Sequence, residues 1–285
     1  MSRPLVTLQI VLVAIQCACA RPQKAAMSVE DAPAPNPSHP SGAAQIDWAD
    51  YALVLSRVVD GDSIRRPELR GSGPQIDHML AQLSDNGPRS SPASTQSTRA
   101  AFYINAHNLL MLAEMRSLDL NSFPRTWPPT LTNARRHRID GRSETVHTLA
   151  AKARDAAGDD WRVRMALFTG RRDGPPLWNR PLLADMLDIQ LDEITRAAVA
   201  SPRVVRIDHG VVKQLLLAGE LYDVREALIR DYERRMHTDG ATILSVLLEQ
   251  ASPFHRQTLN SAVGYKVARL PEDRRLPTAD SRTAD

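Results

Sequence analysis

The chain has 285 residues with 36 basic and 33 acidic side chains, and its formal net charge is +3 at pH 7. Lysine occurs only 4 times, so 32 of the 36 basic residues are arginines, and these are interleaved with acidic residues along the chain. A dispersed charge of this kind argues against the concentrated basic stripe of nucleic-acid-binding proteins. We therefore expect a globular protein without a nucleic-acid partner.

The N-terminus has the order of a secretory signal. Arg3 precedes a mostly apolar run over residues 5–15, and small residues follow up to Ala20. The apolar run is too short to span a membrane as a helix. We predict a signal peptide over residues 1–20 and export to the periplasm or the medium. The alternative is a lipoprotein signal with Cys17 or Cys19 acylated, which would anchor the protein to the outer membrane.

Both cysteines of the chain lie in this signal, so the mature protein would contain none. This excludes disulfides, thiol nucleophiles and thiolate metal sites. Residues 21–45 are rich in Pro, Ala and Ser, which predicts a disordered tether. Residues 46–276 are long enough for a single globular domain, and residues 277–285 are expected to be a disordered tail.

Apolar residues at helical spacing predict helices over residues 48–59 and 76–83. The glycines and proline of residues 70–74 predict a turn, and residues 87–97 form a Pro/Ser loop. A long helix is expected over residues 98–118, where the chain is almost continuously apolar.

Two asparagines, Asn105 and Asn108, interrupt this long apolar helix and share one face of it. Asparagine is a poor residue for a helix interior because its amide competes for backbone hydrogen bonds. The pair either orients a ligand or a catalytic partner, or it bonds the backbone of a buried loop. His107, one turn before Met111 and close to Glu114, is either a general base or a packed, hydrogen-bonded residue.

Three prolines between residues 124 and 129 mark a connecting segment. Asp140-Gly141 predicts the turn of a short hairpin, and Ser143 is placed to begin a helix that Gly158 ends. Residues 161–167 alternate apolar and basic side chains, so they form either a strand or the start of a helix.

Glycines and prolines predict a loop over residues 170–176, and Pro181 opens an amphipathic helix to Ala198. Residues 204–207 are expected to form a strand. Further helices are predicted over residues 212–218, 223–236 and 240–250. The expected fold class is α+β, mainly α: a helical domain with a small antiparallel β element.

Several segments are similar to motifs of one known family. Residues 102–109 read Phe-Tyr-Ile-Asn-Ala-His-Asn-Leu, residues 160–167 read Asp-Trp-Arg-Val-Arg-Met-Ala-Leu, and residues 174–177 read Gly-Pro-Pro-Leu. In these motifs the chain resembles the domain of unknown function 547 family. The closing signature of that family is reduced here to an Asp and a Leu within residues 272–277. The resemblance implies a shared fold over residues 46–276 and carries no assigned activity.

Four of the departures from the family bear on its possible chemistry. Thr169 and Gly174 stand where the family has cysteines, Arg164 replaces a histidine, and His107 replaces a tyrosine. Any activity of this chain is therefore independent of a thiol. The motif positions and the adjoining loop supply the candidate ligand-binding residues, which are Asn105, His107, Asn108, Arg164, Thr169, Gly170 and Gly174.

The first hypothesis for function is an exported cell-envelope domain that binds a small molecule or a partner protein, without redox or thiol chemistry. The second is a hydrolase or transferase with His107 or His209 as general base, and Thr169 or an activated water as nucleophile. The third is a structural envelope protein. We expect no cofactor, and no two histidines have the spacing of a local metal-binding pair. A metal site would have to combine distant residues such as His107, His147 and His209.

Overall fold

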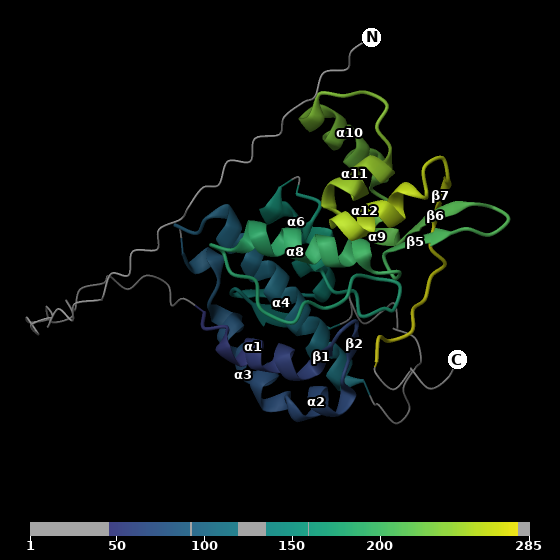
Figure 1. The fold of residues 1–285 in the computed structure, drawn as a ribbon. Coiled ribbons are helices and arrows are strands. Elements are labelled where there is room, and N and C mark those ends of the chain that lie inside the picture. Colours follow the sequence, from purple (N-terminus) through teal and green to yellow (C-terminus); the bar gives the residue numbers. More distant parts are fainter. Residues whose placement is uncertain (1–45, 92, 119–134, 159, 279–285) are drawn as a thin grey trace, which may run out of the picture. The chain divides into compact units, whose positions relative to one another are not determined.

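The computed structural model describes residues 46–91, 93–118, 135–158 and 160–278 (Figure 1). The predicted signal over residues 1–20, the tether over residues 21–45 and the proline segment near residues 124–129 lie outside the described residues. All described residues belong to one compact unit of the chain. No helix in these ranges is long and apolar enough to cross a membrane.

The N-terminal part of the unit consists of three helices and a two-stranded hairpin. These are α1 (Ala49–Val58), β1 (Val59–Asp60), β2 (Ser63–Ile64), α2 (Arg66–Gly71) and α3 (Gly73–Asp85). The helices predicted near residues 48–59 and 76–83 are confirmed as α1 and α3. The turn predicted over residues 70–74 is shorter than expected and is confined to Ser72, because α2 continues to Gly71 and α3 begins at Gly73. Pro74 lies in the first turn of α3, where a missing N–H breaks no helical hydrogen bond.

The predicted central helix is confirmed as α4 (Gln96–Ser117), which follows the short 3-10 helix η1 (Pro88–Ser90). It begins where the Thr95 hydroxyl accepts a hydrogen bond from the Thr98 N–H at 3.1 Å. Every residue from Ala100 to Met115 is buried. A helix that is buried on all sides must be packed by neighbours all round, and α3 and α6 contact it on different faces (Figure 1).

The hairpin predicted at Asp140-Gly141 is confirmed by β3 (His137–Ile139) and β4 (Arg142–Glu144). Both turn residues have positive φ angles, 53° and 71°, as the tightest hairpin turns require. The next helix, α6 (Val146–Ala157), is capped by the Thr145 side chain and not by Ser143, because Ser143 pairs with Arg138 in the hairpin. The helix ends at Gly158, as predicted.

Residues 161–167 contain the helix α7 (Val163–Ala166), so the strand alternative is wrong. The predicted helix from Pro181 to Ala198 is observed as α8 (Leu187–Ala200), which begins later than expected. The reason is tertiary: Asn105 bonds both the N–H and the carbonyl of Leu182, at 2.9 and 2.8 Å. These two bonds hold the segment before α8 out of a helical conformation.

The C-terminal part contains α9 (Gly219–Tyr222), α10 (Arg225–Met236), α11 (Ile243–Gln250) and α12 (Pro253–Asn260), with strands β5 (Val205–Asp208), β6 (Gln214–Leu217) and β7 (Lys266–Arg269). The predicted strand at residues 204–207 and the last two predicted helices are confirmed as β5, α10 and α11. The helix predicted over residues 212–218 is wrong. That segment forms β6, the central strand of a sheet, antiparallel to β5 and parallel to β7.

The fold class is confirmed as α+β and mainly α, with small sheets. The tail predicted from residue 277 is wrong for its first two residues, while residues 279–285 lie outside the described part. Pro277 and Thr278 are buried. The carbonyl of Pro277 accepts a hydrogen bond from the Ile64 N–H at 2.6 Å, and Thr278 bridges to Ile64. Backbone hydrogen bonds hold residues 277 and 278 in place, and the polar composition of the segment gives no sign of them.

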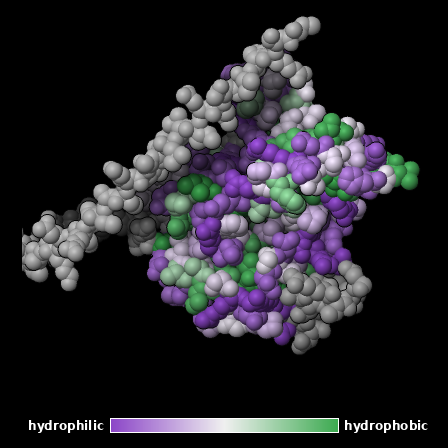
Figure 2. All heavy atoms as spheres, viewed as in Figure 1, coloured by the Kyte–Doolittle hydropathy of each residue, from purple (hydrophilic) through white to green (hydrophobic). Residues whose placement is uncertain are grey.

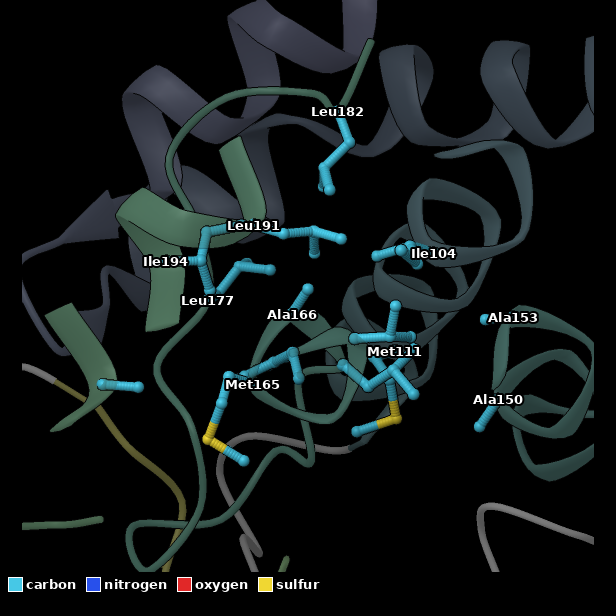
Figure 3. Packing of buried hydrophobic residues seen from close by; sticks show 14 of the residues in the cluster. Ile104, Met111, Ala150, Ala153, Met165, Ala166, Leu177, Leu182, Leu191 and Ile194 are labelled. Carbon is cyan, nitrogen blue, oxygen red and sulfur yellow. The ribbon is translucent and has the colours of Figure 1, made fainter. Parts of the chain in front are cut away.

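The hydrophobic core gathers side chains from α4, α6, α7 and α8. Figure 3 shows Ile104 of α4 pointing toward Leu191 of α8, while the small Ala150 and Ala153 of α6 lie on the other side of α4. The two alanines let α6 approach α4 closely. The surface is largely hydrophilic in the view of Figure 2, and green spheres at its right edge mark the tip of the β5–β6 hairpin, where Val211 and Val212 are exposed.

Candidate functional site

A cavity of about 360 Å³ opens beside α4, between α6, the segment around α7 and the C-terminal part of the unit. This volume is within the range of small-molecule sites. Four arginines, two histidines and one glutamate surround an apolar floor. The lining residues are His107, Met111, Val146, His147, Ala150, Arg154, Arg164, Leu167, Phe168, Thr169, Arg171, Glu220 and Arg274.

Helical geometry explains how these side chains converge. His147, Ala150 and Arg154 are three and seven residues apart on α6, so they share one face of that helix. The small Ala150 leaves room between the two polar residues. Arg164 comes from α7, whose short length directs the chain back toward α4 at Leu167. Elements distant in the sequence thus bring cationic groups to one wall of the cavity.

Arg154 and Arg164 are the unusual pair of this wall. Both are partly buried, and neither has a hydrogen-bonded or ion-paired partner among the residues that the structure describes. Burial lowers the pKa of Arg164, and the nearby charge of Arg154 lowers it further, whereas Asp223 and Glu220 oppose this. Two arginines are therefore held near each other with no carboxylate ion-paired or hydrogen-bonded to either of them in the described residues, although Asp223 and Glu220 offset part of the charge of Arg164. Such an arrangement costs folding free energy, and an anion in the cavity would relieve it.

The other charged groups of the cavity already have partners. Arg171 contacts Asp173 at 2.9 Å and Glu220 at 3.3 Å, and Arg274 bonds Glu272 at 2.9 Å. Burial raises the pKa of Glu220 above its ordinary value. Its Oε2 atom is buried and has no hydrogen-bond partner in the described part of the chain. The positive charge left for a ligand is consequently that of Arg154 and Arg164.

Thr169 and Gly174, the two positions with cysteines in the resembling family, are in contact. A Cβ placed on Gly174 would lie 2.0 Å from Thr169 Oγ1 and 3.2 Å from Thr169 Cβ, so this close approach requires glycine. Thr169 lines the cavity, and its hydroxyl oxygen is buried without a hydrogen-bond partner in the described ranges. Gly170 adopts a φ of 73°, which favours glycine, and it is not part of the cavity wall.

His107 is buried in the cavity floor, with both ring nitrogens against backbone carbonyls. Nδ1 lies 3.1 Å from the Val146 oxygen and Nε2 lies 3.0 Å from the Phe168 oxygen. Burial lowers the pKa of His107, although these two carbonyls act in the opposite direction. The ring ties the start of α6 to the segment after α7. Neither nitrogen presents a lone pair to the cavity, which is what a general base needs.

Asn105 and Asn108 bond loop backbone, as in the structural alternative raised from the sequence. Asn105 holds Leu182, and Asn108 holds the Ala166 carbonyl and the Phe168 N–H at 2.9 Å each. Each buried amide therefore satisfies one donor and one acceptor of a buried loop. Neither asparagine lines the cavity.

The structure brings His107, Arg164 and Thr169 to one cavity, and it leaves His209 elsewhere. His209 is exposed on the β5–β6 hairpin, with Nδ1 2.9 Å from the Tyr265 hydroxyl. No group of three His, Cys, Asp or Glu residues able to hold a metal occurs within the described ranges. Arg171, which lies in the loop where the sequence placed the expected pocket, also lines the cavity, whereas sequence reasoning missed Arg154, Glu220 and Arg274 as site residues. Only the helical spacing of His147 and Arg154 offered a signal for any of them.

No family model, curated protein or solved structure matches this chain. The resemblance to the domain of unknown function 547 family remains a prediction from the motifs. The geometry of the cavity is therefore the basis for a functional proposal.

Proposed function

We propose that this protein is a binding domain for a small anionic molecule, held in the cavity between α4, α6 and α7. The observation that carries the proposal is the pair Arg154 and Arg164, partly buried in the cavity wall with no ion-paired or hydrogen-bonded carboxylate in the described residues. Guanidinium groups bind carboxylates and phosphates through paired, charge-assisted hydrogen bonds.

The rest of the wall supports a ligand that also has an apolar part. Met111, Val146, Ala150, Leu167 and Phe168 line the floor and bury most of their surface. Apolar walls with a few placed polar groups are typical of small-molecule sites. A carboxylate or phosphate attached to a compact apolar or ring-shaped group fits this combination of charge and volume.

The N-terminal sequence supports placing this binding domain in the cell envelope. The charged, apolar and small-residue segments of residues 1–20 are those of an export signal, and acylation at Cys17 or Cys19 stays the alternative route. An exported binding domain without cysteines in its mature part would act independently of the redox state of its surroundings. The partner is then a small molecule of the envelope or the medium.

The hydrolase alternative has less support in the geometry. Its two candidate bases lie apart, since His107 is in the cavity floor and His209 is on an exposed hairpin. Both nitrogens of His107 face backbone carbonyls. The proposed nucleophile, the Thr169 hydroxyl, has no base within hydrogen-bond distance in the described part of the chain.

The test is isothermal titration calorimetry of the purified chain with inorganic phosphate, succinate and benzoate at constant ionic strength. We expect at least one of these anions to bind, and both Arg154→Ala and Arg164→Ala to weaken its binding about tenfold or more. Arg196→Ala is the matched control, because this exposed arginine of α8 borders neither the cavity nor any ion pair in the described ranges. Equal weakening by all three variants would contradict a site at this cavity.

A further inference from the structure

A second cavity, of about 340 Å³, adjoins the first one. It shares two lining residues with the first cavity, Arg154 and Arg164. Its other walls come from the segment before α7, including Trp161, and from one face of α10. The unpartnered arginine pair therefore borders two spaces that lie next to each other.

Helix α10 contributes two arginines to the second cavity. Arg230 and Arg234 are four residues apart, so both lie on the same face of α10, and Ala227 lies one turn before Arg230. The short side chain of Ala227 adds no bulk to this wall. Arginines of α6, α7 and α10 thus line two cavities that have Arg154 and Arg164 in common.

The acidic groups of the second cavity are already engaged. Asp160 bonds Arg162 at 2.8 and 3.0 Å, and Asp231 bonds Arg234 at 2.8 Å and Arg235 at 3.0 Å.

Arg230, by contrast, has no ion-paired or hydrogen-bonded partner in the described part of the chain. Three arginines, Arg154, Arg164 and Arg230, consequently line the two cavities without an ion-paired carboxylate in the described residues. Exposed arginines without partners also occur elsewhere on the surface. What sets Arg230 apart from them is that it borders a cavity whose other wall contains Arg154 and Arg164, two further arginines without an ion-paired carboxylate in the described residues.

We infer that the two cavities form one elongated site for a polyanion, a molecule with several acidic groups in a row such as a condensed phosphate. This inference rests on the proposed anion site and extends it. One acidic group binds at Arg154 and Arg164, and the next ones continue along α10 to Arg230. A single phosphate would engage only the shared pair.

The experiment compares inorganic phosphate with tripolyphosphate by isothermal titration calorimetry, using the full chain in metal-free buffer at constant ionic strength. We expect tripolyphosphate to bind the unaltered protein about tenfold or more tightly than phosphate. Arg230→Ala should weaken tripolyphosphate about fivefold and leave phosphate within about twofold. Arg196→Ala removes the same charge outside both cavities and should leave both affinities within about twofold.

The outcomes separate this inference from the proposed function. If phosphate binding depends on Arg154 and Arg230→Ala weakens tripolyphosphate no more than Arg196→Ala does, the elongated site is wrong and the anion site stands. If neither anion binds, or if Arg154→Ala leaves both affinities unchanged, the elongated site is wrong. The proposed anion site fails with it only if succinate and benzoate also show no binding that depends on Arg154. Unchanged circular dichroism and melting temperature show that the Arg230→Ala variant is folded.

Discussion

Replacing Asn108 by alanine should destabilise the protein strongly, because this side chain satisfies two buried backbone groups at once. It donates to the Ala166 carbonyl and accepts from the Phe168 N–H, both at 2.9 Å. All three residues are nearly inaccessible, with exposed fractions of 2%, 3% and 1% in the order Asn108, Ala166 and Phe168. No water reaches these backbone groups easily once the amide is gone.

The expected loss of stability follows from the two buried backbone groups that Asn108→Ala leaves without a hydrogen-bond partner. Each buried polar group without a partner costs about 1–3 kcal/mol, so Asn108→Ala should lower the free energy of unfolding by about 2–6 kcal/mol. For a domain of this size, 1 kcal/mol corresponds to about 2–4 °C in melting temperature. The variant should therefore melt at least about 4 °C below the unaltered protein.

The assay is urea unfolding followed by circular dichroism, with Asn179→Ala as the control. Asn179 is exposed, and its side chain has no hydrogen bond in the described ranges, so its removal should change the stability by less than about 0.5 kcal/mol. Asn108→Asp adds a second comparison. Its carboxylate can accept a hydrogen bond from the Phe168 N–H, but it is buried and is repelled by the Ala166 carbonyl, and both effects should raise its pKa. A pKa that is raised in the folded state means that stability is lost as pH rises, so the loss of stability in Asn108→Asp should become smaller at lower pH. A loss below 0.5 kcal/mol for Asn108→Ala would refute the reasoning.

Three further predictions concern the residues around the cavity. Burial lowers the pKa of His107, so the unfolded chain binds a proton at a higher pH than the folded protein does, and the stability should fall as the pH drops below about 6.5. In His107→Gln the melting temperature should change less between pH 7.5 and 5.5 than in the unaltered protein, and an equal change would contradict this. With the two native cysteines replaced by serine, Thr169→Cys combined with Gly174→Cys should form a disulfide, because the two Cβ atoms would lie 3.2 Å apart and need only a small shift. The closed loop should add about 2 kcal/mol to the free energy of unfolding, so the melting temperature should be higher without reductant than with it; an equal or lower melting temperature would contradict this. Asp140→Asn should lower the free energy of unfolding less than Asp140→Ala does, because asparagine adopts positive φ angles more readily than alanine and can still accept the hydrogen bond that the Tyr103 hydroxyl donates to Asp140 at 2.9 Å. Equal losses of stability in urea unfolding would contradict this explanation of the turn.

Local patterns predicted the elements whose formation depends on their own residues. The apolar run of α4 and the Asp140-Gly141 turn each carry their signal within a few residues. Two errors have a tertiary cause. Residues 212–218 have an apolar run that suits a helix or a strand, and pairing with β5 and β7 decides in favour of β6. The segment after Pro181 would continue a helical pattern, but the amide of Asn105 engages the backbone of Leu182.

The candidate site was only partly predictable for a similar reason. The motif residues Arg164 and Thr169 lie at the cavity, and His107 forms part of its floor. Arg154 and Glu220 lie in segments without any local motif, and they join the site only because the folded chain brings α6, α7 and α9 to the same cavity. The absence of an acidic partner, which makes Arg154 and Arg164 notable in the described structure, is a property of three-dimensional packing. No spacing in the sequence reveals it.

The most direct test of the account measures thermal unfolding of the unaltered protein, Arg154→Ala and Arg164→Ala, each with and without phosphate at constant ionic strength. If the arginine pair is held for an anion, removing one charge should leave the melting temperature of the ligand-free protein unchanged or raise it, because repulsion is relieved. Phosphate at about a hundred times its Kd should stabilise the unaltered protein by about 2.7 kcal/mol, and it should stabilise neither variant at that concentration to a comparable extent. A marked loss of stability in the ligand-free variants, together with an unaltered response to phosphate, would contradict the account and make the two arginines structural.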